Sequence, residues 1–130
     1  MTQLLLHLWG DYIFQSDWMA QNKTKNSLAA LAHCLTYSVA FWLLRPSLAA
    51  WGVIFGTHFL IDRFRLARYI VWAKNWMAPY AANLHWQNCR KTGYLDDDRL
   101  GPPLWMSVWL MIIADNTLHL TINYLALRLL

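Results

Sequence analysis

Glutamate is absent from this sequence, and its absence limits how much solvated helix surface the chain can have. All of the acidity comes from seven Asp residues. Glu and Lys are the residues that usually cover the exposed faces of helices. Charged residues of both signs make up only 14% of the chain, against about 25% in a typical soluble domain. A surface this poor in charge is difficult to keep in solution.

Cysteine and the common catalytic motifs are also scarce. Cys34 lies in an apolar run, Cys89 lies in a polar segment, and no C-x-x-C occurs. This excludes a disulfide framework and a thiolate metal site, so both thiols are expected to be free. No serine has a hydrolase elbow around it, and no glycine motif for cradling phosphate is present. The first residues lack a basic region and a small-residue cleavage site, so no removed signal peptide is expected.

Apolar and aromatic residues are abundant instead. Hydrophobic residues make up 58% of the 130 residues, with nine Trp and six Tyr. Such a length suits a single domain, and such an aromatic load suits the two interfaces of a membrane. A soluble core rich in Trp is the alternative. The net charge of +4 favours anionic lipid as a partner over nucleic acid, because the basic residues flank apolar runs.

The hydrophobic pattern predicts an all-α membrane protein, with one domain over residues 1–130. Ser27–Leu44 carries no fixed charge, and roughly 20 apolar residues cross the hydrocarbon. The first helix is uncharged only as far as Asp11, so whether it spans the bilayer or lies along the interface stays open. About four transmembrane or membrane-embedded helices are expected, at 2–22, 27–44, 47–77 and 103–129, with a polar loop over 79–102 that can hold one interfacial helix.

The basic residues predict the orientation and the membrane. Lys23, Lys25 and the segment 63–99 hold most of them. By the positive-inside rule these segments face the cytoplasm. The expected location is therefore the inner membrane of a bacterium.

Histidine and aspartate recur at a spacing of four residues. The pairs are His7 with Asp11, His58 with Asp62, and Asp115 with His119. Residues four apart share one face of a helix, so each pair can grip one metal ion. Random placement gives roughly 0.5 such pairs. His33 adds a further helix to this set.

These residues predict a divalent metal site. Polar residues inside a bilayer normally face the interior of the helix bundle and serve a function. Mixed His and Asp ligands suit zinc, manganese or iron, as one ion or two. The expected ligands are His7, Asp11, His33, His58, Asp62, Asp115 and His119. Residues expected to orient them are Gln15, Thr36, Tyr37 and Asn123. The alternative is that the pairs only hold helices together through buried hydrogen bonds.

A run of arginines follows the third predicted helix. Arg63, Arg65 and Arg68 could bind a phosphate or a lipid headgroup. Anchoring at the membrane interface is the plainer explanation of their position.

Three segments of the sequence resemble a known family. "HLWGDYIFQSDWMAQNK", "AHCLTY" and "HFLIDRFRLARY" are similar to the bacterial and phage membrane proteins called domain of unknown function 3307. In that resemblance the family's H-x-x-x-D motifs fall on His7 and Asp11, followed by Gln15, and on His58 and Asp62. The family's remaining His falls on His33. The resemblance implies a membrane protein of bacterial or phage origin without an established activity.

A looser similarity links the same motifs to predicted membrane-bound metal-dependent hydrolases. The leading hypothesis is therefore a membrane-embedded hydrolase of a phosphoester or lipid. A metal ion would activate water, and one of Asp11, Asp62 and Asp115 would take its proton. The alternatives are a non-enzymatic effector, phage-encoded, that binds a host membrane protein, and a proton or ion conductor formed by a homo-oligomer.

Overall fold

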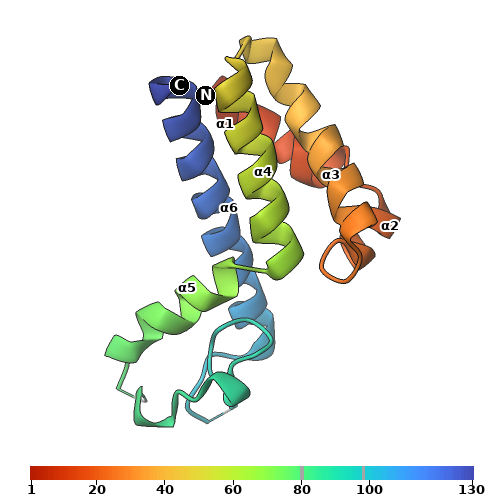
Figure 1. Ribbon diagram of the computed structural model, residues 1–130. Helices are drawn as coiled ribbons and strands as arrows, with labels where there is room; N and C mark the ends of the chain where they lie inside the picture. Colours follow the sequence, from red (N-terminus) through yellow and green to blue (C-terminus); the bar gives the residue numbers. More distant parts are fainter. Residues whose placement is uncertain (80, 98) are drawn as a thin grey trace. The chain divides into compact units, whose positions relative to one another are not determined.

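Every regular element that the structure describes is helical. The computed structural model describes residues 1–79, 81–97 and 99–130, and these ranges contain α, 3-10 and π helices and no strand (Figure 1). The all-α expectation is confirmed for them. Residues 80 and 98 of the predicted polar loop lie outside the described residues.

The chain divides into two compact units. The first unit contains Met1–Phe64 and His119–Leu130, and the second contains Arg65–Leu118. The long helix α6 (Leu104–Leu129) contributes to both. Each unit is described by itself below.

The helix expected over 2–22 is divided into three pieces. They are α1 (Thr2–Leu8), the π-helical turn η1 (Trp9–Ile13) and α2 (Asp17–Asn22). Ser16 has an extended backbone and accepts a hydrogen bond from the Met19 amide, so it caps a new helix instead of continuing the old one. The division follows from this local cap.

The second predicted helix has the expected bounds. It consists of α3 (Ser27–Ala40) and a 3-10 turn, η2 (Phe41–Leu44). Asn26 caps its start by accepting a hydrogen bond from the Leu28 amide at 2.8 Å. Arg45, in the left-handed conformation with φ of 50°, ends it.

The helix expected over 47–77 is broken near its middle. The structure has α4 (Leu48–Phe64), α5 (Ala67–Lys74) and a 3-10 turn, η3 (Asn75–Met77). Arg65 between α4 and α5 has a positive φ of 52°, which an α-helix does not accommodate. Two short 3-10 turns follow, η4 (Ala81–Asn83) and η5 (Trp86–Asn88).

Within the residues that the structure describes, two helices, and not the expected four, are long and apolar enough to cross a membrane. They are Ser27–Leu44 and Leu104–Leu129. The first predicted helix fails because its division leaves only short pieces. The third fails because α4 ends after 17 residues, at Phe64.

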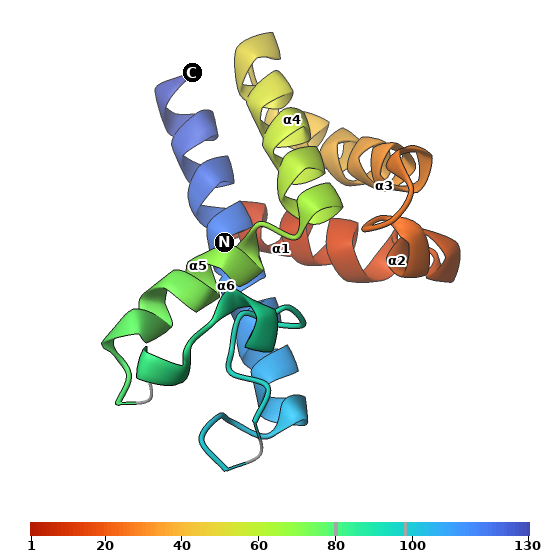
Figure 2. The same cartoon turned by 60° about the horizontal axis from the view of Figure 1, so that its bottom comes forward.

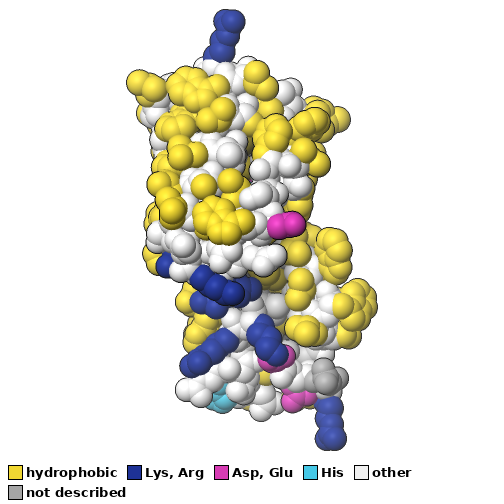
Figure 3. All heavy atoms as spheres, turned by 90° about the vertical axis from the view of Figure 1, so that its right-hand side faces the viewer, with side chains coloured by type: hydrophobic (Ala, Val, Ile, Leu, Met, Phe, Trp, Pro, Cys, Tyr) yellow, Lys and Arg dark blue, Asp and Glu magenta, His cyan; other side chains and the backbone are white. Residues whose placement is uncertain are grey.

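Helix α3 is apolar on its outside and more polar on its inside. Its outward side chains include Leu28, Leu35 and Val39, which are 65%, 44% and 57% exposed. Its buried side includes His33 and Tyr37. A helix on the surface of a soluble domain has the reverse pattern. The face of the first unit seen in Figure 3 accordingly carries many hydrophobic side chains.

The first unit packs around α3. This helix contacts α4 on one side and η1 and α2 on another, as the tilted view shows (Figure 2). A small apolar core joins the elements; it contains Leu6, Tyr37, Phe41, Ile54 and Ala126. Beside this core the buried residues are polar, and they form the candidate site.

Candidate metal centre

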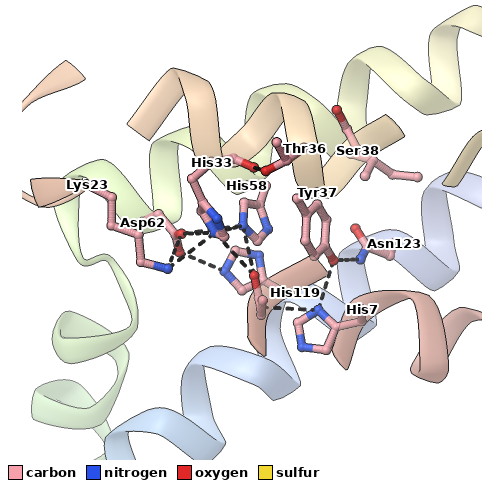
Figure 4. Close-up of polar contacts among 12 residues, drawn as sticks. His7, Lys23, His33, Thr36, Tyr37, Ser38, His58, Asp62, His119 and Asn123 are labelled. Carbon is pink, nitrogen blue, oxygen red and sulfur yellow. Dashed lines mark hydrogen bonds and ion pairs between the residues drawn. The ribbon is translucent and has the colours of Figure 1, made fainter. Parts of the chain in front are cut away.

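Five buried side chains from four elements of the first unit meet beside this core. They are Asp11 from η1, His33 from α3, His58 and Asp62 from α4, and His119 from α6. Figure 4 shows the imidazoles and the Asp62 carboxylate directed at one another. Because α4 is a regular helix here, the i, i+4 spacing puts His58 and Asp62 on its same inward face. The predicted convergence of His and Asp is therefore found for these five.

The Nε2 atoms of His33 and His58 form the middle of the cluster. They are 3.0 Å apart. The same His33 atom lies 3.2 Å from Asp11 Oδ1 and 3.1 Å from Asp62 Oδ2. The His58 atom lies 3.3 Å and 3.4 Å from those two oxygens. Two nitrogens and two carboxylate oxygens thus converge on one point.

This spacing is that of ligands around a small cation. A tetrahedral ion with bonds of about 2.0–2.1 Å keeps its ligand atoms about 3.3–3.4 Å apart. The N–N separation and the four N–O separations among these atoms run from 3.0 to 3.4 Å. The residues Asp11, His33 and His58 form one group that could hold a metal ion, and His58, Asp62 and His119 form another. Both groups are buried.

His119 and Lys23 complete the surroundings of Asp62. His119 Nε2 lies 3.2 Å from Asp62 Oδ1. Lys23 Nζ lies 2.7 Å from Asp62 Oδ2 and 3.3 Å from His33 Nε2. Both oxygens of this carboxylate therefore face donors of the cluster.

Asp11 reaches the cluster from the π-helical turn, a local irregularity that often occurs at functional sites. Burial raises the pKa of its carboxyl, but hydrogen bonds with His33 and His58 outweigh burial and leave that pKa below its usual range. The carboxylate is thus held ionised among imidazoles. A charged oxygen of this kind is ready to bind a cation.

Tyr37 connects the cluster to its supports. Its ring stacks on the His58 imidazole with centroids 3.7 Å apart and an angle of 19° between the planes. Its Oη accepts a hydrogen bond from Asn123 Nδ2 at 2.6 Å and lies 2.8 Å from His7 Nδ1. His7 Nδ1 also lies 3.5 Å from Asp11 Oδ2. The orienting roles of Tyr37 and Asn123 stay predictions. Among the described residues, His7 lies beside the two groups of possible ligands and not in them.

Three other residues of the predicted site are not among the five clustered side chains. Asp115 belongs to the second unit and is in neither group of possible ligands among the described residues. Thr36 is exposed, and its hydroxyl donates to the backbone carbonyls of Ala32 and His33. The buried Oε1 of Gln15 has no hydrogen-bond partner within the described ranges.

Each of the three arginines predicted to bind an anion donates at least one hydrogen bond to an oxygen of the chain. Arg63 is in the first unit and donates to the Thr24 carbonyl at 2.8 Å and to Ser27 Oγ at 3.1 Å. In the second unit, Arg65 donates to the Lys91 carbonyl and Arg68 to the Arg90 carbonyl. Burial and the charge of Arg68 lower the pKa of Arg65. These guanidinium groups bind backbone oxygens, and anion binding by them stays a prediction.

Lys23 is the residue of the centre that the sequence pattern missed. It lies in the polar stretch NKTKN, which the sequence predicts to be a turn that faces the cytoplasm. The structure shows its place in the centre, because the turn lies against the end of α4 and Lys23 contacts Asp62. The opposite charges of Lys23 and Asp62 are far apart in the chain, so no spacing rule could pair them.

Comparison with known proteins finds one family. The family described as "Protein of unknown function (DUF3307)" matches residues 1–91. This match includes Asp11, Lys23, His33, His58 and Asp62 and ends before His119. No curated protein and no solved structure shows a significant match, so the looser similarity to hydrolases has no support from these comparisons.

Proposed function

The chain belongs to the DUF3307 family, whose function is unknown, and we propose that it is a membrane-embedded, metal-dependent hydrolase. One divalent ion, zinc, manganese or iron, is held by Asp11, His33 and His58. Asp62 and His119 stand beside the ion and could hold a second. The observation that carries this proposal is the convergence of His33 Nε2, His58 Nε2 and the two carboxylate oxygens within 3.0–3.4 Å.

A cation explains this convergence better than hydrogen bonds alone. Each neutral imidazole has one proton for its two nitrogens. His33 Nε2 and His58 Nε2 face each other and both carboxylates. Two Nε2 protons cannot satisfy all of these contacts at once. A divalent ion bound by Asp11, His33 and His58 would accept a lone pair from each of them and leave Asp62 Oδ2 to act as a base.

Membrane embedding is supported by the exposed faces of the two candidate spans. Only 39% of the Ser27–Leu44 span and 17% of the tested window in Leu104–Leu129 are buried. The core helix of a soluble protein is mostly buried, whereas these helices expose Leu43, Trp109 and Ile113. Apolar surface of this extent needs a partner, and membrane lipid is the proposed one. The basic segments support the proposal that this membrane is the bacterial inner membrane.

The proposed chemistry is the addition of water across an ester bond. With three protein ligands an ion keeps an open fourth position, as in catalytic zinc sites, and supplies the activation of water. Asp62 Oδ2, at 3.1 Å from His33 Nε2, is close enough to that position to accept the proton of the water. The water oxygen joins the acyl carbon or phosphorus, the bond to the alcohol breaks, and the alcohol receives the proton.

The first experiment is elemental analysis of the detergent-purified protein. We expect one or two equivalents of metal in the wild type and loss of the metal in His58→Ala and Asp11→Asn. His85→Ala is the matched control, because His85 is exposed and belongs to the second unit. Metal-loaded wild type is then screened on phosphoesters and lipid esters.

Absence of metal, even after incubation with zinc and manganese, would overturn the proposal. The His and Asp residues would then serve as contacts between helices. The binding of a host membrane protein by a non-enzymatic effector would become the leading candidate. Proton flux in liposomes would test the third candidate, a conducting homo-oligomer.

A further inference from the structure

We propose that Lys23 is the anion-binding group of the metal centre and that the substrate presents a phosphoryl group to Lys23 and the ion together. This inference rests on the proposed function and names its substrate class. It starts from a residue that lies outside the His and Asp pattern. Figure 4 shows the Lys23 side chain reaching Asp62 at the edge of the cluster.

Lys23 is more exposed than the carboxylates and imidazoles that it contacts or neighbours. Its side chain is 20% exposed, whereas those of Asp62 and His33 are 3% and 0% exposed. Asp11 is 9% exposed and His58 is 1% exposed. A molecule that approaches the ion therefore meets the Lys23 ammonium before the buried ligands.

The charges of the centre give Lys23 a different role once an ion is bound. Asp11 and Asp62 bring two negative charges, and Lys23 brings one positive charge 2.7 Å from Asp62 Oδ2. Buried charges are stable only when they are paired. Without metal, Lys23 is needed to balance a carboxylate. A divalent ion would balance both carboxylates, so Asp62 would no longer depend on Lys23 for charge balance and Lys23 could also pair with an anion.

The position of Lys23 suits an anion that also touches the ion. Its Nζ lies 3.3 Å from His33 Nε2, one of the nitrogens that surround the proposed ion. A phosphoryl group has several oxygens, so one can bind the ion while another accepts from Lys23. When Lys23 turns to the phosphoryl group, Asp62 Oδ2 is released to accept the proton of the water.

Arg63 holds the turn that carries Lys23. It donates to the Thr24 carbonyl and to Ser27 Oγ, and it follows Asp62 directly in the chain. The guanidinium thus fixes the backbone next to Lys23 on the end of α4. The Arg63 guanidinium therefore points to the turn, whereas the Lys23 ammonium points to the cluster.

The test measures phosphate binding to zinc-loaded protein in detergent by isothermal titration calorimetry. The probes are inorganic phosphate and dihexanoyl phosphatidic acid. A charge-assisted hydrogen bond contributes about 1.5–3 kcal/mol, so Lys23→Met should weaken the binding by at least about tenfold. Lys25→Met is the matched control, since Lys25 is an exposed lysine of the same turn, and it should bind like the wild type. Lys23→Arg should retain most of the affinity.

Elemental analysis of the same samples separates the two proposals. Metal in the wild type and in all three variants, with phosphate affinity lost only in Lys23→Met, supports the inference. Equal phosphate affinity in Lys23→Met and the wild type overturns the inference and leaves the metal centre standing. Equal affinity with and without metal also overturns it. A wild type without metal removes both proposals.

The two probes distinguish the source of the phosphoryl group. Binding of phosphatidic acid alone, dependent on Lys23, assigns the site to a lipid headgroup. Binding of inorganic phosphate with equal or greater affinity assigns it to a water-soluble phosphoester. If neither probe binds to the metal-loaded wild type, the inference is contradicted.

Discussion

The ring of Tyr37 lies flat against the imidazole of His58, with the two centroids 3.7 Å apart. Tyr37 comes from α3 and His58 from α4, and both side chains are fully buried. The stacked ring fixes the plane of the imidazole, while the Tyr37 hydroxyl is held by Asn123 and lies beside His7. The imidazole of His58, which we propose as a metal ligand, is thereby oriented by a residue outside the two groups of possible ligands.

This arrangement predicts different results for two substitutions of Tyr37. Tyr37→Phe keeps the stacked ring but leaves the Asn123 amide without its acceptor, which costs about 1–3 kcal/mol of stability. Tyr37→Ala removes the ring and costs about 3–5 kcal/mol. Zinc affinity should therefore change little in the Phe variant and fall clearly in the Ala variant. Thermal unfolding and competition with a zinc chelator measure the two effects, and equal zinc affinity in both variants would contradict a role in orientation.

Gly10 gives a second test of the same contact. A Cβ at position 10 would overlap the ring of Tyr37. Gly10→Ala should therefore destabilise the first unit by about 1–3 kcal/mol through overpacking and should lower metal affinity as Tyr37 shifts.

Two other glycines provide the control for Gly10. A Cβ at Gly52 or at Gly56 meets no atom within 4 Å, and both residues lie inside α4. Ala at either position should raise stability slightly, because Ala is the better helix former by about 0.5–1 kcal/mol. The melting temperatures of the three variants in detergent decide the matter, and a Gly10→Ala variant as stable as the other two would disprove the close packing.

Asp115 and His119 are expected to differ in their effect on metal content. His119 Nε2 lies 3.2 Å from Asp62 Oδ1, and His119 is in a group that could hold an ion. Asp115, one helical turn earlier, is in neither such group among the described residues. His119→Ala should weaken metal binding, and Asp115→Asn should leave the metal content unchanged. Loss of metal from Asp115→Asn would contradict this expectation and indicate that Asp115 is a ligand.

Val39 tests whether the outer face of α3 meets lipid. It is 57% exposed and lies inside the Ser27–Leu44 span. On a soluble surface Val39→Asp would be tolerated, since exposed polar substitutions usually change stability by less than about 0.5 kcal/mol. In hydrocarbon an Asp costs about 2.5–3.5 kcal/mol. We expect Val39→Asp to reduce the amount of protein that carbonate extraction leaves in the membrane, with Val39→Leu as the matched control.

Local rules were sufficient for part of the fold. The uncharged run between Asn26 and Arg45 predicts the bounds of the second helix. In the structure Asn26 caps its start, and the left-handed Arg45 ends it. The same rules failed near Arg65. Its positive φ breaks a helix that apolar periodicity alone would continue to residue 77. Breaks of this kind depend on contacts made elsewhere in the fold.

The sequence by itself determined that the chain is helical, that the stretch 27–44 is long and apolar, and that His58 and Asp62 share one face. These properties follow from composition and from a period of 3.6 residues, which are local. Only the tertiary structure decided that His33, Asp11 and His119 meet that pair and that Asp115 is in neither group. It alone placed Lys23 on Asp62, because an ion pair across 39 positions of the chain depends on how the helices pack and not on any spacing along them.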